Sequence, residues 1–189
     1  MKIQIGVMGS AGGVITDEQI ALARRVGVCV AQRKCVIVTG ACPGLPHAAV
    51  LGAHDAGGES LGISPAHSRE EHVGVYESPI EPYSAMVYTG SGLMGREVEN
   101  IHSSDFVIFL GGRSGTLGEF AIAYDEGKLI GILRNSGGIA NELARIAATI
   151  DKATGATLVE DDDPERLVDQ CMQRFVGETR PSSMVFDHV

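Results

Sequence analysis

The stretch 104-SDFVIFLGGRSGTLGEF-120 decides the fold of this chain, because it joins an apolar run to a glycine-rich turn and then to a helical pattern. Residues 105–110 form the apolar run, which is typical of a parallel strand buried on both faces. Gly111 and Gly112 follow, and glycine permits backbone conformations that other residues rarely adopt. Residues 116–127 have a helical pattern, so the stretch predicts a strand, a tight turn and a helix.

The same unit recurs along the chain. Strands are predicted at 2–9, 35–40, 59–64, 85–90, 105–110 and 128–133, with a short one near 157–159. Helices are predicted at 16–32, 46–57, 93–104, 116–127, 139–150 and 165–177. Thr16 and Gln19 form a capping-box pattern at the first helix, and Asp163 caps the last one. The polar segment 65–83 is predicted to be a long loop with a short strand at 73–77.

Alternating strands and helices of this kind predict an α/β fold. Because the strands are continuous apolar runs, we expect a three-layer, Rossmann-like parallel sheet with helices on both faces. The chain has no internal repeat and no clear domain boundary. We therefore expect a single nucleotide-binding domain over residues 1–189, with a C-terminal helical appendage at about 160–178.

Composition excludes several classes of partner. The net charge of −9 argues against a nucleic-acid binder, which needs a surface of Lys and Arg to neutralise phosphates. The longest apolar runs are too short to span a bilayer, and the N-terminus has no secretory signal pattern. We expect a cytoplasmic protein that binds neither nucleic acid nor membranes.

The cysteines and histidines do not have the spacing of a metal site. The four cysteines form no CxxC pair, and the usual role of a thiol beside apolar residues is a buried, reduced one. Cys42 lies in a glycine-rich loop and could contact a ligand, although a small buried thiol is favoured. His67 and His72 fit no strong metal motif, and His47 is expected on a helix surface. We expect no metal site and no required cofactor.

Three glycine-rich loops follow predicted strands, at 9–13, 40–46 and 111–116. The carboxyl ends of parallel strands meet at one edge of the sheet, where open α/β folds bind their ligands. Three such loops at one edge predict a phosphorylated ligand. The residues expected to contact it are Gly9, Ser10, Gly40, Gly111, Gly112, Arg113, Ser114, Gly115 and Thr116.

The helix start after Gly112 has two interpretations. Its unpaired amides and the positive end of the helix dipole could bind a phosphate, helped by the Ser114 and Thr116 hydroxyls and the Arg113 charge. Thr116 and Glu119 could instead form a capping box with no ligand. Spacing alone does not separate the two. The stretch is neither a Walker A loop, since no lysine follows Gly115, nor a nucleophile elbow.

The same residues resemble the "PGGxGTxxE" motif of the Lonely Guy (LOG) superfamily, and the resemblance covers roughly residues 2–150. The segment 39-TGACPGLPHAAVLGAHDAGGESLGISPA-66 is especially similar to the molybdenum cofactor carrier branch of that fold. Gly111 stands where the motif has proline and Arg113 where it has its second glycine. These two departures bear on the shape of the phosphate loop.

The resemblance implies specific roles. LOG enzymes hydrolyse the N-glycosidic bond of a nucleoside 5′-monophosphate, and their motif glycines and threonine hold the phosphate. Carried over, Gly112, Gly115 and Thr116 hold the phosphate, while Glu119 and Arg96 are catalytic. Without the resemblance, Arg96 would be a solvated helix residue paired with Glu99 or Asn100. Glu97 stands where LOG enzymes often carry lysine, which bears on the identity of the substrate.

Two functions remain open at this point. One is a LOG-like phosphoribohydrolase that acts on a nucleoside monophosphate through Glu119 and Arg96. The other is a carrier that holds the phosphate of the molybdenum cofactor, or a nucleotide sensor, without chemistry. The ligand is therefore a nucleoside monophosphate or the molybdenum cofactor. The resemblance also implies a homodimer or a higher homo-oligomer.

Overall fold

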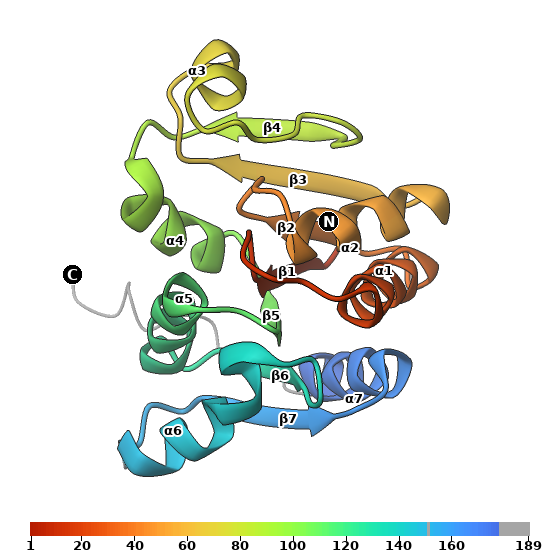
Figure 1. Cartoon of the computed structure of the whole chain (residues 1–189). Helices are drawn as coiled ribbons and strands as arrows, with labels where there is room; N and C mark the ends of the chain where they lie inside the picture. The colour runs from red at the N-terminus through yellow and green to blue at the C-terminus, as the bar shows by residue number, and fades with distance from the viewer. Residues whose placement is uncertain (151, 178–189) are drawn as a thin grey trace, which may run out of the picture.

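The computed structural model describes residues 1–150 and 152–177 and contains one seven-stranded parallel sheet between two layers of helices (Figure 1). Its strands are β1 (Gln4–Gly9), β2 (Val36–Thr39), β3 (Glu59–Ser64), β4 (Ala85–Tyr88), β5 (Phe106–Leu110), β6 (Leu129–Leu133) and β7 (Thr157–Asp161). Its helices are α1 (Asp17–Gln32), α2 (Leu45–Asp55), α3 (Arg69–Gly74), α4 (Gly92–His102), α5 (Ser114–Asp125), the 3-10 helix η1 (Gly138–Glu142), α6 (Leu143–Ile150) and α7 (Pro164–Gly177). The predicted three-layer, Rossmann-like α/β fold is confirmed.

The helices divide between the two faces of the sheet (Figure 1). Helices α1, α2 and α7 cover one face, where Ile5, Val7 and Ile108 contribute to the larger core. Helices α4, α5 and α6 cover the other face, where Met8 and Phe109 contribute to the second core. Because side chains alternate along a strand, each central strand supplies both cores.

The strand order β4-β3-β2-β1-β5-β6-β7 places a topological switch in the middle of the sheet. The chain runs outward from β1 to β4, returns, and places β5 on the free side of β1. The loops after β1 and β5 therefore lie side by side and lead to helices on opposite faces of the sheet. Open α/β sheets bind their ligands in the crevice at this point.

The segment 65–83 differs from the prediction. Residues Arg69–Gly74 form helix α3, which begins at the N-cap Ser68, whose hydroxyl accepts a hydrogen bond from the Glu71 amide. The prediction of a strand at 73–77 was wrong, because the N-cap Ser68 and the acidic residues of the first turn start a helix that includes residues 73 and 74.

The C-terminal part of the described chain packs into the domain. Strand β7 extends the sheet beside β6, and Leu167, Val168 and Cys171 of α7 are buried in the larger core. The segment predicted as a C-terminal helical appendage at about 160–178 contains the end of β7 and helix α7, and residue 178 is outside the described residues. A single nucleotide-binding domain over residues 1–189 stays a prediction. In the part of the chain that the structure describes, no helix has the length and apolar character needed to cross a bilayer.

Candidate functional site

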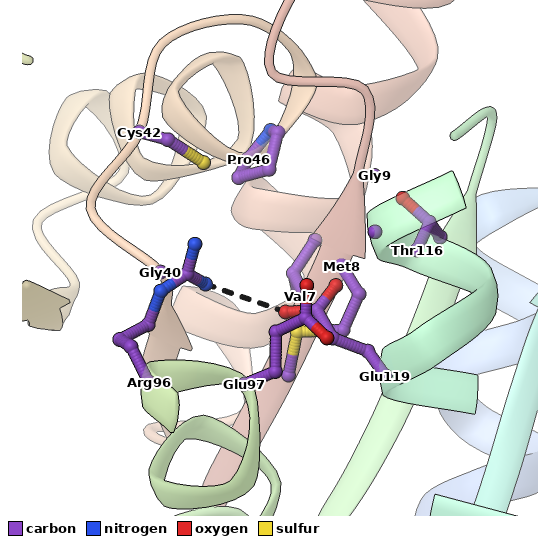
Figure 2. A pocket seen from close by; sticks show the side chains of 11 residues that line it. Val7, Met8, Gly9, Gly40, Cys42, Pro46, Arg96, Glu97, Thr116 and Glu119 are labelled. Carbon is purple, nitrogen blue, oxygen red and sulfur yellow. Dashed lines mark hydrogen bonds and ion pairs between the residues drawn. The ribbon is translucent and has the colours of Figure 1, made fainter. Parts of the chain in front are cut away.

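The candidate site lies at the switch between β1 and β5. Figure 2 shows its residues arriving from the end of β1, the loop after β2, helix α4 and the first turns of α5. An inner cavity of ≈ 60 Å³ lies among Gly9, Gly40, Cys42, Pro46 and the helix residues around Arg96 and Glu119. The predicted residues of the three glycine-rich loops thus meet at the carboxyl edge of the sheet.

An outer cavity of ≈ 420 Å³ opens beside the inner one. The two share Arg96, Glu97, Gly115 and Thr116, which form the boundary between them. The outer cavity is also lined by Ala11, Leu93, Arg113 and Ser114. Its size is in the range of ligand sites in proteins.

Helix α5 starts two residues earlier than predicted, at Ser114. Gly111 and Gly112 have φ angles of 60° and 94°, so the turn before the helix uses the left-handed region that glycine favours. The N-cap is Arg113, and no side chain caps the helix. The alternative in which Thr116 and Glu119 form a capping box is therefore wrong. The first residues of α5, Ser114, Gly115 and Thr116, line the outer cavity, and no side-chain oxygen caps the amides of this helix start.

The two glycines of this turn are held by the protein itself. The Gly112 amide donates to Ser10 Oγ and the Gly111 amide donates to Ser136 Oγ, both at 2.9 Å. Their carbonyl oxygens accept hydrogen bonds from the Ile139 and Ala140 amides. In this structure Gly111, Gly112 and Ser10 shape the loop, and the uncapped amides belong to the residues after them. Their direct contact with a ligand stays a prediction.

Arg96 and Glu119 meet in the interior, as Figure 2 shows. Arg96 Nη1 lies 3.4 Å from Glu119 Oε1, and both residues are less than a tenth exposed. Asn100 Nδ2 donates to the same carboxylate oxygen at 3.0 Å. The alternative of a solvated Arg96 paired with Glu99 or Asn100 is therefore wrong. Gly40 makes this arrangement fit, because a side chain there would overlap the Arg96 guanidinium.

Burial has the largest effect on the pKa of Glu119 in this pair. It raises the pKa of Glu119 to about 7, although Arg96 and the Asn100 hydrogen bond favour the charged carboxylate. Two buried polar atoms here, Arg96 Nε and Asn100 Oδ1, have no hydrogen-bond partner among the described residues. A buried donor and a buried acceptor are thus available beside a carboxyl group that titrates near neutral pH.

Glu97 adds a second carboxylate at the boundary of the cavities. It is 6% exposed and packs over the first turn of α5. Gly115 and Gly118 leave room for it: Glu97 Oε1 lies 3.2 Å from where a Cβ of Gly115 would be, and Oε2 lies 2.8 Å from that of Gly118. Burial raises the pKa of Glu97, and Arg96 opposes this.

The weaker candidates have structural roles. His72 is fully buried, with Nδ1 2.8 Å from Ser64 Oγ and Nε2 3.1 Å from the Pro79 carbonyl oxygen. His67 is an exposed residue beside Glu71. Across residues 1–150 and 152–177, no group of three or more metal-ligating side chains comes together. Burial raises the pKa of the Cys42 thiol, which faces the inner cavity.

Sequence reasoning missed two residues that organise the site. Ser136 follows β6 and holds Gly111, while Asn100 of α4 holds Glu119. Ser136 has no motif of its own, so no local signal could have found it. Asn100 lies four residues after Arg96, and this spacing places both on one side of α4.

Comparison with known proteins agrees with this architecture. An uncharacterized protein from Archaeoglobus fulgidus is 34% identical over 135 residues, which are 71% of this chain and 82% of that protein. The molybdenum cofactor binding protein of Rippkaea orientalis has a similar structure, with a TM-score of 0.73, 27% identity and coverage of 92% of this chain and 98% of that one. The molybdenum cofactor carrier protein of Chlamydomonas reinhardtii has a TM-score of 0.75 at 23% identity, covering 94% of this chain and 100% of that one, and shows the shared fold.

The family model described as SLOG cluster4 matches residues 2–168, which span β1 to the second turn of α7. The matched range contains the carboxyl-edge loops, Arg96 and Glu119. The resemblance to the LOG superfamily, on the branch similar to the molybdenum cofactor carriers, is confirmed. The chain belongs to the SLOG cluster4 family.

Proposed function

We propose that this protein binds a phosphorylated pterin of the molybdenum cofactor type at the carboxyl edge of its sheet and carries it without chemistry. The observation that carries the proposal is the uncapped start of α5 beside the outer cavity, because amides at a helix N-terminus bind phosphate. The 27% identity to the cofactor-binding protein of Rippkaea orientalis supports the identity of the ligand.

The residues present fit such a ligand. The Ser114 and Thr116 hydroxyls and the Arg113 guanidinium line the outer cavity and would hold the phosphate with the α5 amides. Arg96 lines both cavities, and its unpartnered Nε would offer a hydrogen-bond donor to a polar ligand. The carrier needs no group that moves a proton, so Glu119 would serve to hold Arg96 in place.

The test is to purify the protein, denature it, and analyse the released small molecules by mass spectrometry, with pterin and molybdenum measured together. We expect a phosphorylated pterin in the wild-type protein and several-fold less in Thr116→Val. Thr149→Val is the matched control, because its hydroxyl bonds the Arg145 carbonyl on α6, away from both cavities. Equal pterin in both variants would remove Thr116 from the site, and no pterin in any preparation would contradict the carrier function.

A second function is favoured by one observation, the buried contact of Arg96, Asn100 and Glu119. A carboxyl group whose pKa lies at about 7 is suited to orient or deprotonate water, as hydrolysis of a nucleoside 5′-monophosphate requires. Arg96 would hold the phosphate or the ribose.

Incubation with AMP, CMP, GMP, IMP and UMP, followed by chromatography for free base, tests this second function. Hydrolysis predicts base release by the wild type and its loss in Glu119→Ala. Release that persists in Glu119→Ala would exclude Glu119 from the reaction. If no base is released and a pterin is found bound, the hydrolase function is excluded and only the carrier function remains.

A further inference from the structure

Glu97 is a buried carboxylate without a hydrogen bond. It is 6% exposed, and within residues 1–150 and 152–177 its oxygens form no hydrogen bond and no ion pair. Its neighbour Arg96 reaches Glu119 instead, at 3.4 Å. Because Glu97 lines both cavities, its free oxygens face the space that a ligand would enter. Among the described residues the buried side-chain atoms without a partner are Arg96 Nε and Asn100 Oδ1, so the Glu97 oxygens reach the solvent of the cavities, where an incoming anion would meet their charge.

The charges around Glu97 do not balance. Helix α4 presents the Arg96 guanidinium and the Glu97 carboxylate, and α5 presents the Glu119 carboxylate. From the remaining elements, the Cys42 thiol faces the inner cavity, and Arg113 lies at the outer one with its guanidinium packed against Gly12 and Gly13. Arg113 is exposed, so water screens its charge. The buried part of the site thus holds two carboxyl groups and one guanidinium.

We propose that Glu97 determines the charge of the ligand that this site accepts, so that a tetrahedral dianion binds at the start of α5 only together with one proton taken up from solvent. The inference rests on the proposed function, because it assumes that a phosphate binds at this place. The proton goes to the carboxyl pair of Glu97 and Glu119, and one remaining carboxylate then balances Arg96. Without that proton, the incoming anion would meet two buried negative charges at the shared wall of the cavities.

The electrostatics of both acids agree with this. Burial raises the pKa of Glu97 and raises that of Glu119 to about 7, so the pair exchanges a proton near neutral pH at little cost. An anion bound beside them raises both pKa values further, because binding of the anion and protonation of the acids favour each other. Affinity for the anion should therefore fall roughly tenfold per pH unit above about pH 7.

Sulfate is the first probe, because it carries no proton of its own near neutral pH, whereas a phosphate monoester does. Titration calorimetry at pH 6, 7 and 8, in two buffers of different ionisation enthalpy, measures the protons taken up per sulfate bound. We expect wild-type protein to take up close to one proton at pH 8. AMP is the second probe and reports the same linkage for a phosphate monoester.

Glu97→Gln keeps the shape of the side chain, loses no hydrogen bond and removes the surplus charge. We expect it to bind sulfate at least tenfold more tightly than the wild type at pH 8, with little proton uptake. Glu99→Gln is the matched control, because it removes the same charge from α4 at a residue that bonds Ser91 and lines neither cavity. It should behave as the wild type does.

The outcomes separate the two proposals. Sulfate and AMP binding that is equal in the wild type and Glu97→Gln, without proton uptake, would overturn the role of Glu97 and leave the phosphate site intact. Binding of neither probe to either protein at any pH would overturn the phosphate site and with it the proposed function. If Glu97→Gln and Glu99→Gln increase the affinity for sulfate equally, the effect comes from the overall charge of α4. That result would also overturn the specific role of Glu97.

Discussion

At the scale of single residues, the site consists of buried charged side chains that have few hydrogen-bond partners. Glu119 accepts from Arg96 and Asn100, and Gly40 leaves the space that Arg96 fills. Glu97 lies beside them without a donor among the described residues. The site therefore holds two neighbouring carboxyl groups with raised pKa values. Their protonation can be measured through the pH dependence of stability and of binding.

Glu119 should make folding stability depend on pH. Its pKa rises from an ordinary 4.5 to about 7 on folding, so between these values the folded state binds more protons than the unfolded state. The stabilisation that comes from protonated Glu119 is then complete below about pH 4.5 and is lost as the pH rises through 7. The loss is about 3 kcal/mol at 1.36 kcal/mol per pKa unit.

Urea unfolding at pH 5 and pH 8 measures this change. Glu119→Gln cannot titrate, so we expect its stability to fall less than that of the wild type over the same interval. Parallel pH profiles for the two proteins would show that Glu119 folds with an unshifted pKa.

At the scale of elements, the loop between β5 and α5 is supported by a segment that is distant in sequence. Ser136, three residues after the end of β6, accepts from the Gly111 amide, and the Ile139 and Ala140 amides bond the carbonyl oxygens of the two glycines. The motif therefore keeps its shape through the β6–η1 connection and not through its own residues alone.

Ser136→Ala should leave the Gly111 amide buried without an acceptor. We expect a loss of roughly 1–3 kcal/mol in the free energy of unfolding, together with weaker sulfate binding. Ser78→Ala is the control, since that hydroxyl bonds only the nearby Tyr76 carbonyl. A variant with wild-type stability and wild-type affinity would show that the loop does not need this support.

At the scale of the whole molecule, the expected homo-oligomer stays a prediction. Helix α4 carries Met94 and Val98, which lie four residues apart and are 74% and 39% exposed. Such a pair lies on one side of a helix, next to Leu93 at the outer cavity. We expect a homodimer in solution that covers this apolar side of α4.

Light scattering after size-exclusion chromatography measures the assembly. The double variant Met94→Glu and Val98→Glu should run as a monomer, because like charges would face each other across the interface. Val75→Glu changes an equally exposed residue outside α4 and should leave the dimer intact. A wild-type monomer at tens of micromolar concentration would contradict the expectation.

The sequence by itself determined the order of the seven sheet strands and of the longer helices, the parallel sheet and the convergence of glycine-rich loops, because these follow from apolar runs, turn residues and connections that are short in sequence. It also placed Arg96 and Glu119 together, through the family resemblance. Only the tertiary structure decided that α5 begins at Ser114 without a cap, that Ser10 and Ser136 hold the turn glycines, and that Glu97 lies buried without a donor. The reason is physical: hydrogen-bond partners and desolvation depend on groups brought together from five separate segments, and no local pattern records which of them will be left unpaired.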